Sequence, residues 1–318
     1  MREIVIGKNE AGQRFDKFLG KYLNEAPKSF IYKMLRKKNM TLNGRKADGS
    51  ERLEENDVVK LFLSDETIEG FRHTKAVAPY KGLRPTVIFE NSDLLILNKP
   101  AGLLSQGDKS GDPSVAAFVP AYLLESGQLT EADLQKFTPA PCNRLDRNTS
   151  GLILCGKSLA GEQYLSEVIR SRALEKYYLT IVHGVLTGEK LLTAYGRKDT
   201  KNNRLEVRDT RAEGFDELKL SYKALATSSD MTLLEVHLIT GKSHQIRAQL
   251  SHIGHPVAGD SKYGGKRVAT DRQRLGLRSH LLHARRIVLP DGQSFTAPLS
   301  PIFEKAAKSC GLPAGGKD

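Results

Sequence analysis

Tryptophan is absent from the 318-residue sequence, and cysteine is scarce. The three cysteines, Cys142, Cys155 and Cys310, cannot form a disulfide framework, and none belongs to a CxxC pair typical of structural zinc. We therefore expect three reduced thiols. No apolar run approaches the roughly 18 residues that a membrane-spanning helix needs, and the first residues lack the apolar segment of a signal peptide. These absences predict a cytoplasmic protein that does not enter a membrane.

Positive charge exceeds negative charge in the sequence. Lysine and arginine total 49 against 37 aspartates and glutamates, which gives a formal net charge of +12. Such a surplus favours polyanionic partners, because cationic side chains that neutralise phosphates release counterions. A solvated basic surface has the same composition, so charge alone does not separate a nucleic-acid-binding protein from an ordinary basic protein.

Two short amphipathic helices are predicted near the start of the chain, over residues 12–23 and 29–38. In both segments apolar residues recur at spacings of three and four. Asn43-Gly44 predicts a tight hairpin turn, and residues 57–63 predict a strand that closes the unit. Basic residues crowd the polar side of the second helix and enter the hairpin: Lys28, Lys33, Arg36, Lys37, Lys38 and Arg45. A helical hairpin with a solvated basic face is the alternative to a binding module.

The remainder of the chain predicts a larger domain dominated by strands. Apolar or alternating segments predict strands between residues 87 and 97, 151–154, 176–182, 218–222 and 233–239, and a helix over about 159–171. A second helix is expected between Ser243 as N-cap and Gly254 as C-cap. Many strands with few interleaved helices predict an α+β fold, with a mostly antiparallel or mixed central sheet and flanking helices.

The length fits about two domains of roughly 150 residues. We expect a small domain over residues 1–72, a linker over 73–85, a large domain over 86–304 and a C-terminal tail over 305–318. Residues 65–85 as a whole show little periodicity and are expected to be irregular.

One segment, Asn143 to Gly151, combines an acid with flanking bases. Asp146 follows Arg144 and precedes Arg147, and nearby cations keep a carboxylate ionised. An ionised carboxylate in a loop suits a nucleophile or a general base. Spacing alone leaves a second interpretation, in which the same residues form a structural ion-pair cluster.

The segment resembles the RLDRxTSG signature of the RluA-type pseudouridine synthases, whose nucleophile is the aspartate of that motif. Further segments resemble family motifs in the same order: Asn98–Gly102 (NKPxG), Lys176–Gly184 (K-x-Y…V-x-G) and Thr240–Gly264 (TGRxHQIR…GHP…GD..YG). Residues 12–65 resemble the S4 RNA-binding domain. Together these likenesses cover nearly the whole chain, in the arrangement of the RluC/RluD subgroup.

The resemblance implies an enzyme that isomerises uridine to pseudouridine in RNA, most often in large-subunit ribosomal RNA, without a cofactor or a metal. It implies Asp146 as nucleophile or base, Tyr178 as the tyrosine that stacks on the target base, and Arg247 as the cation paired with Asp146. Arg144 would fill the gap that a flipped base leaves in the RNA helix. The basic residues of the S4-like module would contact RNA phosphates. We expect a monomer.

The sequence departs from the family pattern at three positions: Asn143 replaces the usual His, Asn148 the usual Asp, and Lys242 the common Arg. The neighbour Tyr177, on the opposite face of its strand, is expected in the core. His244, His252 and His255 are expected in polar helix and loop roles rather than at a metal. A basic segment predicts a hairpin tip that either touches RNA or is solvated: Lys198, Lys201, Arg204, Arg208 and Arg211.

Two other functions remain open at this point. One is an RNA-binding protein whose enzyme domain is inactive, although the presence of Asp146, Tyr178 and Arg247 argues against it. The other is a glycosidase or base-excision enzyme that uses a single carboxylate. Glycosidases usually need a second carboxylate, and the motifs contain none.

Overall fold

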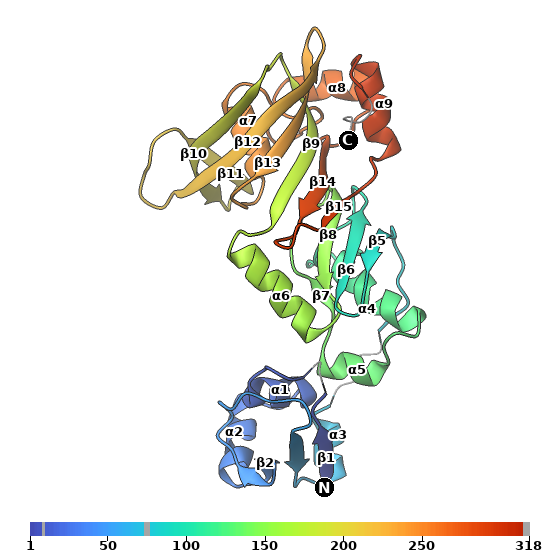
Figure 1. The fold of residues 1–318 in the computed structure, drawn as a ribbon, viewed down its shortest axis with the longest axis vertical. Helices are drawn as coiled ribbons and strands as arrows, with labels where there is room; N and C mark the ends of the chain where they lie inside the picture. Colours follow the sequence, from blue (N-terminus) through green and yellow to red (C-terminus); the bar gives the residue numbers. More distant parts are fainter. Residues whose placement is uncertain (8–9, 73–76, 314–318) are drawn as a thin grey trace.

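The computed structural model describes residues 1–7, 10–72 and 77–313 and contains two separate β-sheets. A small N-terminal part packs its own sheet against short helices, and a large part is built on a long sheet (Figure 1). Lys21 of the small part lies over the ring of Phe137 of the large part, 6.0 Å from its centroid, so the two parts touch there. Within the described residues, no helix has the length and apolar character to cross a membrane.

The small part has a four-stranded antiparallel sheet in the order β1-β4-β2-β3. Its elements are β1 (Arg2–Val5), α1 (Phe15–Tyr22), α2 (Lys28–Arg36), β2 (Met40–Leu42), β3 (Arg45–Lys46), β4 (Val58–Leu61) and α3 (Asp65–Gly70). The two predicted helices and the hairpin are confirmed. Asn43 and Gly44 both have positive φ angles, 50° and 74°, as the tight turn between β2 and β3 requires.

Two elements of the small part were not predicted. Strand β1 pairs with β4, and its short sequence carries no periodicity of its own. Residues 65–70 are helical rather than irregular, because Ser64 caps the Thr67 N–H and Ile68 is buried in the small core. The expected linker over 73–85 lies partly outside the described residues, which leave out 73–76.

The large sheet has eleven strands, and its main path runs β11-β10-β12-β13-β9-β14-β8-β6-β5. Strand β14 pairs in parallel with β8, whereas its pairing with β9 and the other neighbouring pairs are antiparallel. The predicted α+β class with a mixed sheet is confirmed. The strands are β5 (Thr86–Glu90), β6 (Leu94–Lys99), β7 (Ala140–Pro141), β8 (Ser150–Gly156), β9 (Glu175–His183), β10 (Glu189–Asp199), β11 (Arg204–Arg208), β12 (Asp216–Thr227), β13 (Met231–Leu238), β14 (Leu282–Val288) and β15 (Ser294–Thr296).

Helices cover both faces of the large sheet. They are α4 (Val115–Glu125), α5 (Glu131–Lys136), α6 (Leu159–Arg170), α7 (Gln245–His252), α8 (Arg267–Leu275) and α9 (Pro301–Ser309). Successive residues of β9 show how the faces are divided: Tyr178 joins a core with Leu250 of α7, whereas Leu179 joins a core with Phe303 of α9. Strand periodicity therefore places Tyr178 on the same face as α7.

Three local expectations are wrong. The tail does not begin at residue 305, because α9 runs to Ser309 and its Ala306 and Ala307 are fully buried. The N-cap of α7 is His244 rather than Ser243, and Gly254 follows the C-cap instead of forming it. Tyr177 is only half-buried.

Candidate active site

The loop that carries Asp146 is fixed at the centre of the large sheet. It connects β7 to β8, and β8 begins beside β14. Gly151 has a φ of 108°, and a Cβ at this position would lie 2.2 Å from the carbonyl oxygen of Ala284. Ser105 Oγ donates to the carbonyl of Leu145 at 2.8 Å and accepts from its N–H at 2.9 Å. Contacts on both sides of Asp146 in the sequence, at Leu145 and at Gly151, therefore fix the backbone of the loop.

Asp146 and Arg247, far apart in sequence, form an ion pair in the structure. Arg247 Nη1 donates to Asp146 Oδ2 at 2.8 Å, and its Nε and Nη2 donate to the two carboxylate oxygens of Asp260 at 2.6 and 2.8 Å. Asp260 is completely buried and Arg247 is 4% exposed, whereas the side chain of Asp146 is 25% exposed. Asp260 thus fixes Arg247 from behind, and Asp146 is the carboxylate that solvent or a substrate can reach.

Asp260 and Arg247 hold each other ionised. Burial works against the charge of Asp260, but hydrogen bonds from Arg247 outweigh it and lower the pKa of Asp260. Burial likewise opposes the charge of Arg247, but Asp260 and Asp146 together raise its pKa. A permanently charged guanidinium thus faces Asp146.

His244 faces the same carboxylate. Its Nε2 lies 3.8 Å from Asp146 Oδ2, and its Nδ1 lies 3.2 Å from the hydroxyl of Tyr263. The Leu205 N–H donates to that hydroxyl oxygen at 2.7 Å, which leaves the Tyr263 O–H able to donate to His244 Nδ1. Burial lowers the pKa of His244 and favours the neutral ring. With the Tyr263 hydroxyl as donor, the single ring proton would lie on Nε2, toward Asp146.

Tyr178 lies level with the end of the Asp146 loop, where β8 begins. In the sheet register Tyr178 pairs with Ala284, which in turn pairs with Gly151. The side chain is 7% exposed, and its hydroxyl donates to no other residue that the structure describes. Burial raises the pKa of Tyr178, and the charge of Asp146 adds to this effect. The phenol is therefore protonated at neutral pH.

Lys99 is completely buried beneath the loop. Its Nζ donates to the carbonyls of Pro100, Leu103 and Arg147 at 3.1, 2.8 and 3.0 Å. Burial lowers its pKa to about 7, with Asp146 acting in the opposite direction. Lys99 and Asp260 lie within motifs noted in the sequence, but the sequence analysis gave neither a role. Lys99 precedes a proline and Asp260 follows a glycine in these motifs, and that signal alone does not say what either side chain contacts.

The other expected site residues are distributed more widely. Arg144 is exposed and forms no ion pair or hydrogen bond with the described residues. Asn143 Oδ1 accepts from the Leu154 N–H at 2.8 Å, which gives it a structural contact. The basic residues of the small part are exposed, and no described contact brings them to Asp146: Lys28, Lys33, Arg36, Lys37, Lys38 and Arg45.

The basic hairpin between β10 and β11 divides into two groups. Lys198 and Arg204 line a cavity of about 220 Å³ together with Lys242 and His244, so this part of the hairpin adjoins the site. Arg208, in contrast, is paired with Glu206 at 2.8 Å. Lys242 itself pairs with Asp216.

The three histidines have separate polar contacts. His252 pairs with Asp209 at 2.8 Å, and His255 Nδ1 donates to the carbonyl of His183 at 2.8 Å. Among the residues that the structure describes, no group of three or more His, Cys, Asp or Glu side chains could hold a metal ion.

Comparison with known sequences finds relatives that align over most of the chain. Residues 93–252 match the family described as RNA pseudouridylate synthase. The chain is 30% identical over 314 residues to ribosomal large subunit pseudouridine synthase C of Vibrio cholerae, which covers 95% of each chain. It is 32% identical over 267 residues to an uncharacterized RNA pseudouridine synthase of Mycoplasma genitalium, covering 80% of this chain and 79% of that one.

A solved structure shows the same fold. Human RNA pseudouridylate synthase domain containing 4 superposes with a TM-score of 0.60 at 21% identity, over 71% of this chain and 94% of that one. The sequence matches extend through the segments that supply Asp146 and Arg247. The chain therefore belongs to the RNA pseudouridylate synthase family, the isomerases that convert uridine in RNA to pseudouridine.

Proposed function

We propose that Asp146 is the carboxylate that acts on the target uridine, and that the reaction needs no cofactor. The observation that carries this proposal is the Asp146–Arg247–Asp260 cluster. Its one partly exposed acid is paired with a cation that a buried second acid holds in place. The fixed Arg247 donates to Asp146 Oδ2 at 2.8 Å and so holds the orientation of that carboxylate.

The chemistry requires uracil to leave C1′, turn, and rejoin through C5. An ionised Asp146 would either attack C1′ or take the 2′ proton as the base departs. In the first case the glycosidic electrons leave with uracil, and they return when C5 bonds to C1′ and Asp146 is released. The proton then lost from C5 balances the one gained at N1. Tyr178 would stack on the detached base, and Arg144 would occupy the gap in the RNA helix.

We propose large-subunit ribosomal RNA as the substrate, because the relatives that align over nearly the whole chain are named for it. Residues 1–72 would form an S4-like RNA-binding domain and 73–85 a linker. The catalytic domain would begin at residue 86 and include α9 through Ser309. The exposed basic residues of α2 and the β2–β3 hairpin support contact with phosphates, which fixes position without reading sequence. The proposal includes a cytoplasmic monomer, whose mass light scattering would measure.

Tritium release from RNA labelled at uridine C5 tests the role of Asp146. Asp146→Asn should abolish release while RNA affinity and folding are retained. Asp112→Asn is the matched control, because Asp112 pairs with Arg147 on the same loop at 2.8 Å. Turnover by Asp146→Asn within about tenfold of wild type would contradict the assignment.

Neutralising the small part tests the RNA-binding module. Lys33→Gln, Lys37→Gln and Lys38→Gln together should raise KM, reduce the salt dependence of binding and leave kcat nearly unchanged. Lys305→Gln, Lys308→Gln and Arg274→Gln, far along the chain, form a charge-matched control. Equal binding by the two triple variants would contradict a phosphate-binding role for α2.

A further inference from the structure

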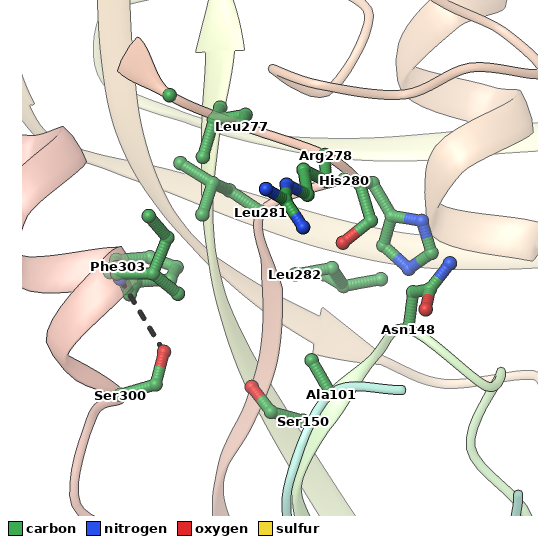
Figure 2. A pocket seen from close by; sticks show the side chains of 13 residues that line it. Ala101, Asn148, Ser150, Leu277, Arg278, His280, Leu281, Leu282, Ser300 and Phe303 are labelled. Atoms are coloured by element: carbon green, nitrogen blue, oxygen red, sulfur yellow. Dashed lines mark hydrogen bonds between the residues drawn. The ribbon is translucent and has the colours of Figure 1, made fainter. Parts of the chain in front are cut away.

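A cavity of about 300 Å³ opens beside the Asp146 loop and has no part in the chemistry proposed above. The loop turns sharply at Asp146, where the Thr149 N–H donates to the Asp146 carbonyl at 3.0 Å. Asn148, at the third position of this turn, lines the cavity, and Ser150 follows it (Figure 2). Two residues of chain span at most about 7 Å, so the cavity begins one short step from Asp146.

The cavity combines apolar walls with a polar edge. Figure 2 shows the side chains of Asn148, Arg278 and His280 gathered on one side, and Phe303 on the opposite side. The apolar walls come from Leu277, Leu281, Leu282, Ile302 and Phe303. No acid lies among the described residues that line the cavity, and Arg278 is its one formal positive charge. This combination suits a flat, largely apolar group attached to an anion.

Two of the polar side chains are available to a ligand. Arg278 is exposed, and neither its guanidinium nor the Asn148 amide bonds to another residue within the part of the chain that the structure describes. His280, in contrast, is occupied: its Nε2 lies 2.9 Å from Thr149 Oγ1, and burial lowers its pKa to about 4. The histidine is neutral and fixes the turn, so Arg278 and Asn148 are left to recognise the occupant.

We propose that this cavity takes the base of the nucleotide next to the target uridine in the RNA strand, with its phosphate on Arg278 and its edge on Asn148. Sequence-specific RNA recognition works mainly on splayed, single-stranded bases whose edges are hydrogen-bonded. The Asn148 amide has one donor and one acceptor side, as the edge of adenine or cytosine requires. Neighbouring nucleotides are covalently joined, so a uridine at Asp146 delivers its neighbour to this turn. The inference rests on the proposed function, because it assumes RNA at Asp146.

Fluorescence anisotropy with the full chain and short single-stranded RNAs measures the binding step without requiring turnover. Each RNA carries one uridine, and the nucleotides on its two sides are varied among the four bases and an abasic residue. An abasic residue on one side should weaken binding about tenfold, and the Asn148→Ala variant should lose the difference among bases. Arg278→Gln should weaken all the RNAs about tenfold, the scale of one charge-assisted hydrogen bond. Arg274→Gln, an exposed arginine paired with Asp230 outside the cavity, should bind like wild type.

Equal affinity of the wild-type protein for abasic and intact neighbours on both sides would overturn the proposal, as would base discrimination retained by Asn148→Ala. Saturable binding of adenosine monophosphate that competes with RNA through Arg278 alone would assign the cavity to free nucleotides and also overturn it. Tritium release from the same RNAs separates the two proposals. If binding depends on the neighbouring base but no tritium is released, the proposed reaction is refuted. If tritium is released normally but binding does not depend on the neighbouring base, the proposed role of the cavity is refuted.

Discussion

Asp260→Asn is the substitution that tests most directly how the site is held together. The carboxylate of Asp260 accepts two hydrogen bonds from Arg247, at 2.6 and 2.8 Å, and one oxygen also accepts from the N–H groups of Lys262 and Tyr263. An amide keeps one acceptor oxygen. If that oxygen continues to accept from the Lys262 and Tyr263 N–H groups, the amide nitrogen of the variant faces the Arg247 Nε–H. Two hydrogen-bond donors then face each other, and the hydrogen bond to Arg247 Nε is lost.

The expected loss of stability follows from burial. Removing one partner of a buried ion pair costs about 3–5 kcal/mol, because the remaining charge has lost its compensation. Arg247 keeps Asp146 at 2.8 Å, so we expect the lower end, about 3 kcal/mol. Urea unfolding followed by far-ultraviolet circular dichroism measures this, since the chain has no tryptophan for fluorescence.

Asp216→Asn is the control, because its pair with Lys242 is exposed and surface pairs contribute about 0–1 kcal/mol. Asp260→Asn should also lower kcat at least about tenfold with RNA affinity retained, because Arg247 is then no longer fixed against Asp146. If Asp260→Asn lost no more stability than Asp216→Asn, or kept full kcat, Asp260 would not be the group that positions Arg247.

Three other outcomes are expected. The pKa of Lys99 is about 7 in the folded chain instead of 10.5, so between pH 7 and 10 the unfolded chain binds more protons at Lys99 than the folded chain does. The free energy of unfolding of the wild type should therefore rise with pH, relative to that of Lys99→Met, by up to about 4 kcal/mol. Parallel profiles of the two proteins in urea unfolding would refute this. Tyr263→Phe removes the hydroxyl that faces His244 Nδ1. If that hydroxyl is the donor, nitrogen-15 spectra should change from the Nε2–H tautomer to a mixture as kcat falls several-fold; an unchanged tautomer would exclude control by Tyr263. In Gly151→Ala the added methyl group would meet the Ala284 carbonyl, which should lower the free energy of unfolding by about 3 kcal/mol or more. Gly111 also has a positive φ, 74°, but faces open space, so Gly111→Ala should lower it by only about 1–2 kcal/mol. Equal losses for the two variants in denaturant unfolding would show that the close approach to β14 is not the constraint.

Elements whose signals are local could be predicted from the sequence alone. Helix α6 was expected over about 159–171 and runs Leu159–Arg170, because its apolar spacing and its N-cap Ser158 act within one segment. The Asn43-Gly44 turn was likewise set by residues that adopt positive φ at low cost. Asp146 was found through the resemblance of its segment to a family motif, whereas the spacing of its charged neighbours alone favoured a structural ion-pair cluster.

Tertiary structure decided which groups face Asp146. Arg247 and Asp260 come from segments a hundred residues further along the chain, and their contacts depend on how α7 packs against the large sheet. His244 caps α7 in the left-handed conformation, which its sequence does not favour, and only the surrounding contacts with Tyr263 and Asp146 account for its orientation. The part of α9 from residue 305 on was predicted to be a tail, because its few apolar residues give little signal until the core that they fill is present. Burial changes the pKa of Lys99, His244 and Tyr178, and burial is a property of the packed sheet, which no local pattern in the sequence specifies.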